Sequence, residues 1–258
     1  MDLAGIPLRT DRRWRMGRFF SLWVSVALLA GGMRMPLAFG EIDPVAEKIF
    51  SSYATFLGGE DAFREIDTAK LTMTMEMPGL GMNMERTVTF KAPDKIYVDV
   101  DIQGYGKMLQ GFDGESGWAI DPIQGRRPLK GRELEQLKEE TNFKEGLYLT
   151  EKYSSAKVVG KSDDGLTMIE CVKADNGLKE TLYFEEPEGL LRRSDYIEDM
   201  GPQGSVPVSA RVDVYKKVGD IRLPMETSAE MMGTSMRVVI TSFEPNVEVD
   251  DSIFKMPE

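Results

Sequence analysis

The residue types that usually carry catalysis are scarce in this chain. Histidine is absent and Cys171 is the single cysteine. Without histidine the chain lacks the commonest general base and the commonest zinc ligand, and no Ser-His-Asp triad can form. Ser116 stands in Gly-Glu-Ser-Gly-Trp, which differs from the Gly-x-Ser-x-Gly turn that exposes a catalytic serine. We therefore predict a protein that is not an enzyme and has no cofactor and no metal site.

One acidic segment has the spacing of a metal site but lacks its residues. Asp99, Asp101 and Gly104 stand where a calcium-binding loop of the EF-hand type begins. Gln103, however, replaces the third acidic ligand, and Gln110 replaces the glutamate that binds calcium through both oxygens. We expect the two aspartates to lie on a solvated strand edge.

The segments after Thr68 carry a different signal, an apolar strand face rich in methionine. Residues 71–77 and 82–90 alternate apolar and polar side chains around the turn at Pro78-Gly79, which predicts a β-hairpin. Methionine suits an irregular core, and it equally suits a surface that accepts ligands of varied shape. A curled sheet of many strands encloses more volume than its side chains readily fill. We therefore interpret the methionine-rich face as the wall of an apolar cavity that accepts ligands. The predicted lining residues are Met73, Met75, Met77, Met84, Val88, Phe90, Val98, Val100, Met225, Met231, Met236 and Val238.

Arg86 interrupts this apolar face. It falls between Met84 and Val88, where a dry environment is expected. An unpaired buried guanidinium is costly, so an inward Arg86 must contact a carboxylate, backbone carbonyls or a polar group of a ligand. The alternative is a local bulge that turns Arg86 outward.

The elements that position this face follow from hydrophobic periodicity. Asp43 and Pro44 are typical of a helix start, and the helical pattern runs on to Gly58-Gly59. Alternating runs then extend to residue 242 and predict about nine or ten strands. A later helical segment, Arg132 to Thr141, has Leu134 and Leu137 as its apolar residues on a charged surface. So narrow an apolar stripe docks weakly, which makes this helix a candidate lid with Arg86, Leu134 and Leu137 as its contacts.

Together these elements predict a mainly β (α+β) fold. Strands joined by local hairpins form an antiparallel sheet with one buried face, and a sheet of this many strands curls. We expect a curled antiparallel sheet that forms an incomplete β-barrel, with a helical lid over an apolar cavity. Residues 41–258 show no linker or repeat and are expected to form one domain.

The first 40 residues have the layout of a cleavable signal peptide. Five arginines between residues 9 and 18 precede an apolar run from Phe19 to Ala30, and Ala38-Phe39-Gly40 provides a cleavage pattern. The apolar run is shorter than the roughly 20 residues of a membrane span, although an uncleaved anchor is the alternative. Translation from Met1 or from Met16 would each yield a complete signal. We expect export to the periplasm, without a lipid anchor because no cysteine follows the apolar run.

Charge limits the partners of the mature chain. Residues 1–40 hold six arginines and two aspartates, so residues 41–258 carry 26 basic and 41 acidic side chains and a net charge of −15. A chain this acidic is repelled by nucleic acid and by anionic lipid headgroups. We expect no nucleic-acid partner, and a monomer.

Short segments spread over residues 41–258 resemble the LolA-like outer-membrane lipoprotein-sorting family. They are Leu57-Gly58-Gly59, Ala92-Pro93-Asp94-Lys95, Gly111-Phe112-Asp113-Gly114 with Gly117-Trp118, Tyr183-Phe184 with Gly189-Leu190-Leu191, Gly219 to Pro224, and the closing Val249 to Pro257. Each segment is short, but their order and spacing together are specific.

The resemblance implies a periplasmic carrier or binder of lipoproteins or other lipidated ligands that shields acyl chains in an apolar cavity. Donor and acceptor proteins in the inner and outer membranes would be its partners. In such carriers an arginine inside the barrel bonds to the lid, and Arg86 is the residue here that matches this role. Other members of the fold bind a partner protein as envelope sensors or assembly factors, which is the alternative function.

Overall fold

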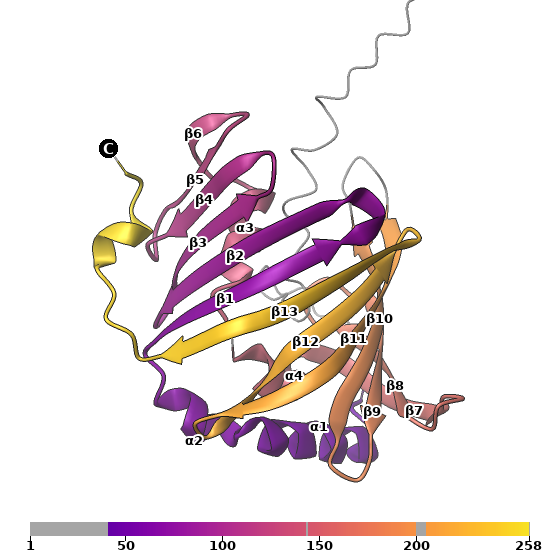
Figure 1. Ribbon diagram of the computed structural model, residues 1–258. Coiled ribbons are helices and arrows are strands. Elements are labelled where there is room, and N and C mark those ends of the chain that lie inside the picture. Colours follow the sequence, from indigo (N-terminus) through magenta and orange to yellow (C-terminus); the bar gives the residue numbers. More distant parts are fainter. Residues whose placement is uncertain (1–40, 143, 200–204, 258) are drawn as a thin grey trace, which may run out of the picture.

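A strongly curled antiparallel sheet forms most of the molecule over the residues that the computed structural model describes, 41–142, 144–199 and 205–257 (Figure 1). The predicted signal segment, residues 1–40, lies outside these ranges. The sheet contains 13 strands in the described ranges and does not close. This confirms the mainly β fold class and the curled, incomplete barrel. The strands are β1 (Thr68–Met77), β2 (Met82–Lys91), β3 (Lys95–Ile102), β4 (Gly106–Phe112), β5 (Gly117–Asp121), β6 (Gly125–Pro128), β7 (Tyr153–Lys161), β8 (Thr167–Lys173), β9 (Lys179–Glu185), β10 (Leu190–Asp199), β11 (Ser205–Val218), β12 (Ile221–Met231) and β13 (Thr234–Pro245).

The strand order explains why a helical segment covers the opening. Neighbouring strands follow the chain order, except that β1 pairs with β13, so β6 and β7 become the two edges of the sheet. These two strands are consecutive in sequence but lie at opposite edges. The chain between them must therefore cross the opening, and it contains α3 (Arg132–Glu139), a 3-10 turn (Glu145–Leu147) and α4 (Leu149–Lys152).

The N-terminal helices close one end of the curled sheet. α1 (Pro44–Leu57) begins at Asp43, whose carboxylate accepts a hydrogen bond from the backbone nitrogen of Val45 at 2.8 Å. It is followed by α2 (Gly59–Arg64), and Figure 1 shows both helices lying across the same end. The buried side chains of α1 are Ala46, Ile49, Phe50, Tyr53 and Leu57. Val45 is 55% exposed and lies outside this buried face. The predicted start at Asp43 and Pro44 and the predicted end at Gly58 are correct.

The two edge strands are the elements that periodicity misses. β6 has the sequence Gly-Arg-Arg-Pro and offers no apolar alternation. β7 buries only Tyr153 and Ala156 among its nine residues. An edge strand has one neighbour and less to bury, so its sequence pattern is weak. These two strands account for part of the difference between the 13 strands of the described residues and the nine or ten expected.

The C-terminal segment packs on the outer face of the sheet. Tyr97, Gly111 and Trp118 lie side by side across β3, β4 and β5, on the face opposite to Ile96 and Phe112. The indole nitrogen of Trp118 donates to the backbone carbonyl of Phe254 at 2.7 Å, and the side chain of Phe254 is fully buried. Trp118 therefore anchors the chain terminus and does not rim a cavity.

An acid-sensitive ion pair holds this terminus. The amino groups of Lys91 and Lys95 contact the carboxylate of Asp251 at 2.5 and 2.7 Å and lower the pKa of Asp251 from 3.8 to about 2. A carboxyl group with a lowered folded-state pKa stabilises the fold above its ordinary pKa, and this contribution is lost as the pH falls toward the folded-state value. We expect the terminus to loosen between about pH 4 and pH 2.

Fluorescence of Trp118, the single tryptophan of residues 41–258, measures this loosening. In processed protein its emission should shift to the red as the pH falls through that window. Asp251→Asn should show a weakened terminus already at neutral pH and little further change on acidification. Coincident titrations of the two proteins would contradict the assignment to Asp251.

Among the described residues, no helix is both long enough and apolar enough to cross a membrane.

Candidate functional site

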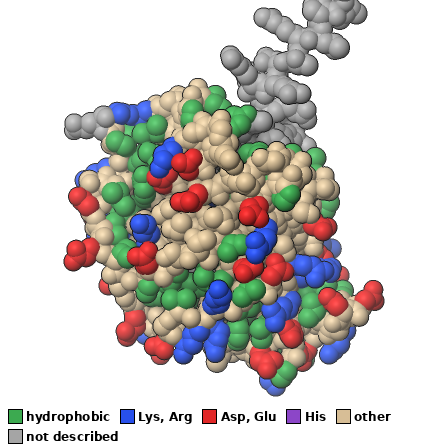
Figure 2. All heavy atoms as spheres, in the orientation of Figure 1, with side chains coloured by type: hydrophobic (Ala, Val, Ile, Leu, Met, Phe, Trp, Pro, Cys, Tyr) green, Lys and Arg blue, Asp and Glu red, His purple; other side chains and the backbone are tan. Residues whose placement is uncertain are grey.

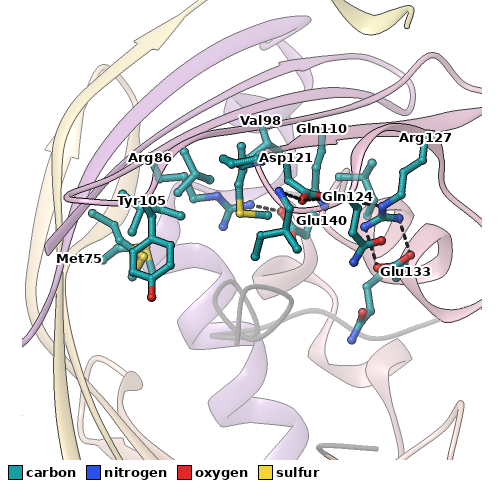
Figure 3. Close-up of a pocket in the computed structure, with 18 residues that line it drawn as sticks. Met75, Arg86, Val98, Tyr105, Gln110, Asp121, Gln124, Arg127, Glu133 and Glu140 are labelled. Atoms are coloured by element: carbon teal, nitrogen blue, oxygen red, sulfur yellow. Dashed lines mark hydrogen bonds and ion pairs between the residues drawn. The ribbon is translucent and has the colours of Figure 1, made fainter. Parts of the chain in front are cut away.

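A cavity of about 90 Å³ lies between the concave face of the sheet and α3 (Figure 3). Most of its apolar lining comes from β1 to β4, and most of its polar lining comes from the segment between β5 and the end of α3. In Figure 3 Met75 and Tyr105 mark the apolar end, Asp121 lies near the middle, and Arg127 and Glu133 mark the other end. The apolar lining comprises Met75, Met84, Val98, Val100, Ile102, Tyr105, Met108, Pro122, Ile123 and Leu137, and the polar lining comprises Arg86, Gln110, Asp121, Gln124, Arg127, Glu133, Gln136 and Glu140.

Arg86 points into this cavity and bonds to the lid. β2 pairs in regular register with both neighbours at this position, so Arg86 shares the inner face with Met84 and Val88, and the outward bulge is wrong. Its terminal nitrogen Nη2 donates to the carboxylate of Glu140, the residue that ends α3. The side chains are 6% and 20% exposed, respectively. A buried guanidinium is thus paired with a carboxylate of the helix that crosses the opening.

A second ion pair holds the other side of the lid. Arg127 of β6 donates two hydrogen bonds to the carboxylate of Glu133, at 2.8 and 3.1 Å. Nε of Arg86 is buried and has no hydrogen-bond acceptor among the described residues, whereas Nε of Arg127 lies 3.7 Å from Oδ2 of Asp121. One N–H donor at the cavity wall, that of Arg86, is therefore left for an oxygen atom of a ligand.

The apolar contacts of α3 are few. Leu137 is 2% exposed, and Leu134 is partly buried over β5. A Cβ atom on Gly117 of β5 would lie 2.6 Å from Cδ1 of Leu134, so the missing side chain of Gly117 lets the helix approach the sheet. Besides these two leucines and the two ion pairs, the amino group of Lys138 lies 5.7 Å from the centroid of the Phe112 ring on β4. For a helix these are small contacts.

Replacement of Gly117 by valine tests this close approach. The added side chain overlaps Leu134 and should displace α3, at a cost of about 1–3 kcal/mol in the free energy of unfolding. Hydrogen exchange should become faster in α3 than in β1 and β2. Gly79→Val is the matched control, because the nearest atom to its added Cβ is 3.7 Å away. Equal exchange in α3 for both variants would contradict the role of Gly117.

The predicted site residues divide into two groups in the structure. Met75, Met84, Val98 and Val100, together with Arg86 and Leu137, line the cavity. The others lie outside the cavity lining, Leu134 on α3 and the rest on the inner face of the sheet. Of these, Met73, Met77, Val88, Phe90, Met225 and Met236 are buried, and Leu134, Met231 and Val238 are partly buried against the core.

The inner face of the second half of the sheet is filled by aromatic side chains and polar pairs. Phe184 of β9 contacts the rings of Phe50 and Tyr53 of α1, with ring centroids 5.8 and 5.9 Å apart. The hydroxyl of Tyr153 donates to Glu180 at 2.9 Å, and Lys173 lies 3.7 Å from the same carboxylate. The space left here is about 50 Å³.

Sequence reasoning missed the polar half of the cavity. One signal was available, because Glu133, Gln136, Leu137 and Glu140 recur at the three- and four-residue spacing of one helix face. This face contains the buried Leu137, so its polar members had to lie beside the sheet. Gln110, Asp121, Gln124 and Arg127 had no comparable signal.

Comparisons with known proteins give similarity in fold. No family model and no curated protein matches the chain. A DUF1329 family protein from Desulfovibrio piger superposes with a TM-score of 0.53 at 14% identity, covering 83% of this chain and 98% of that one. A LolA superfamily protein from Nitrosomonas europaea gives 0.53 at 12% identity, covering 81% and 97%. The match to a putative outer membrane lipoprotein-sorting protein domain from Vibrio parahaemolyticus has a TM-score of 0.48 at 12% identity, covering 72% and 88%.

Proposed function

From the LolA-like fold of this chain, we propose that it is a periplasmic carrier or binder of lipoproteins or other acylated ligands. The ligand's acyl chain occupies the cavity under α3, and the chain performs no catalytic step. The observation that carries the proposal is the helix that crosses the opening, tied by Glu140 to the buried Arg86 over a methionine-lined wall.

The size of the cavity implies that the lid must move. At about 90 Å³ it is smaller than the cavity of roughly 150 Å³ that accommodates a benzene ring. An acyl chain of a dozen carbons does not fit into this volume. The described arrangement therefore corresponds to the closed form, and loading requires α3 to swing away from β4 and β5.

Because α3 docks weakly, the free-energy cost of moving it away from the sheet is small. Leu137 is the one fully buried apolar residue of the helix, and the Arg127–Glu133 pair is partly exposed. Each methylene of a ligand that becomes buried contributes about 0.8 kcal/mol, so a few methylenes offset the loss of these contacts. The Nε–H group of Arg86 would bond to an ester or amide oxygen at the polar end of the ligand.

The cellular setting of the proposal follows from the sequence. Residues 1–40 would direct export and be removed, and the acidic mature chain would cross the periplasm as a monomer. A carrier also requires a donor and an acceptor, which we place in the inner and outer membranes.

Native mass spectrometry of protein purified from the periplasm tests the function. We expect adducts whose masses correspond to lipids or acylated peptides, and their loss after delipidation. Adduct-free protein that also fails to bind a dansyl-labelled acyl chain would overturn the proposal. Recovery of one stoichiometric partner protein without any lipid would favour a sensor or assembly factor.

A further inference from the structure

The exposed apolar side chains are concentrated at one end of the sheet. Nine large apolar residues are exposed among the described residues, and six of them lie at or beside hairpin turns of the same end. We refer to these six as the apolar tips. They are Leu80 (53% exposed), Tyr105 (45%), Ile123 (61%), Leu178 (38%), Ile197 (44%) and Met232 (71%).

The strand order places these turns together. In an antiparallel sheet alternate turns share an end, so the turns after β1, β3, β5 and β12 lie on the same rim. The β1–β2 and β12–β13 turns are in contact, since a Cβ on Gly79 would lie 3.7 Å from the methyl group of Thr234. Figure 1 shows these turns along one rim and α1 at the opposite end.

The turns of the opposite end differ in composition. They read Ala-Pro-Asp at 92–94, Asp-Gly-Glu-Ser at 113–116, Glu-Pro-Glu-Gly at 186–189 and Gly-Asp at 219–220. Beside the remaining turn of this end, between β7 and β8, the described residues include one large exposed apolar side chain, Val159 at 41%. Polar turns favour solubility at either end of the sheet, and the apolar tips are an exception to this composition.

The apolar tips also adjoin the cavity. Tyr105 and Ile123 both line it, from the β3–β4 and β5–β6 turns. A surface that contacts this rim is therefore placed beside the cavity.

We propose that the apolar tips insert into the surface of a lipid bilayer with neutral headgroups. The tips present single side chains on separate hairpins, and this arrangement suits a continuous apolar medium better than the compact anchor pocket of a protein partner. Tyrosine at a tip is typical of the membrane–water boundary. The net charge of −15 over residues 41–258 opposes anionic lipids, and Figure 2 shows charges of both signs intermixed on the visible face.

Vesicle flotation with protein produced from the full chain tests the proposal. Phosphatidylcholine vesicles are compared with vesicles that also contain phosphatidylglycerol. The tip variant is Leu80→Ser/Ile197→Ser/Met232→Ser, which leaves the cavity lining unchanged. Its matched control is Val45→Ser/Val159→Ser/Met256→Ser, which removes three exposed apolar residues that lie away from this rim. Exposed substitutions change stability little, and urea unfolding of both variants verifies this.

We expect the unaltered protein and the control to float with neutral vesicles, and the tip variant to bind at least about tenfold more weakly. Added phosphatidylglycerol should weaken binding further at low salt. Absence of flotation by the unaltered protein, or equal loss in both triple variants, overturns the proposal. The same holds if the protein does not float and the tip variant instead loses cross-linking to one envelope protein, which would identify a protein partner. These outcomes do not depend on cavity loading, so failure here leaves the proposed function intact.

Discussion

Glu140→Leu is expected to lower the free energy of unfolding by about 3 kcal/mol, because it leaves the charged Arg86 buried without a carboxylate. Arg86→Met should cost less, about 1 kcal/mol, since Glu140 lies nearer the surface and can turn toward water. The double variant Arg86→Met/Glu140→Leu should recover most of the stability, as apolar residues replace a buried pair at little cost. Urea unfolding of the four proteins measures the coupling directly.

The second ion pair of the lid provides the control for this cycle. Arg127 and Glu133 also join the sheet to α3, but Glu133 is 52% exposed, so Glu133→Leu should cost no more than about 1 kcal/mol. If Glu140→Leu and Glu133→Leu destabilise equally, burial of Arg86 does not control lid docking. Additive effects of Arg86→Met and Glu140→Leu would likewise show that the two residues are not coupled.

The hairpin of β1 and β2 shows what the sequence predicts well. Alternation in residues 71–77 and 82–90 predicts both strands and their buried faces, and Met75 and Met84 face each other across the pair as expected. Arg86 is placed correctly for the same reason, because a period of two leaves it on the inner side. Side-chain alternation is a local property and survives any arrangement of the remaining strands.

The cavity itself depends on contacts that no local pattern contains. Met225 and Met236 have the same alternation as Met75, yet they lie outside the cavity lining. The volume remains open where α3 covers β4 and β5, which follows from the long connection between β6 and β7. Glu133 and Glu140 resemble a solvated helix face in the sequence, and only their approach to Arg127 and Arg86 gives them partners.

Filling the cavity is expected to separate ligand uptake from stability. Val100 of β3 lines the cavity and is only partly buried, so the larger side chain of Val100→Phe extends into space that is already empty. Its free energy of unfolding should stay within about 1 kcal/mol of the original value, because the new ring replaces void and not packed atoms. Uptake of a dansyl-labelled acyl chain should fall sharply.

The size of this loss follows from the bulk of the added ring. The side chain of phenylalanine has four more carbon atoms than that of valine, so the ring displaces roughly three methylenes of a bound acyl chain from the wall formed by β3. Excluding three methylenes at about 0.8 kcal/mol each removes roughly 2.4 kcal/mol of binding free energy, or about fiftyfold in affinity. A titration of dansyl fluorescence against protein concentration resolves a change of this size.

Val88→Phe is the matched control for Val100→Phe. Val88 lies on the same inner face, is 2% exposed and does not line the cavity. Overpacking should cost this variant about 1–3 kcal/mol of stability while the folded fraction still takes up the acyl chain. A carrier with its site under α3 thus predicts opposite results for two identical substitutions on neighbouring strands. If Val100→Phe instead loses stability and keeps its uptake, the methionine-lined wall is ordinary core and the acyl chain binds elsewhere.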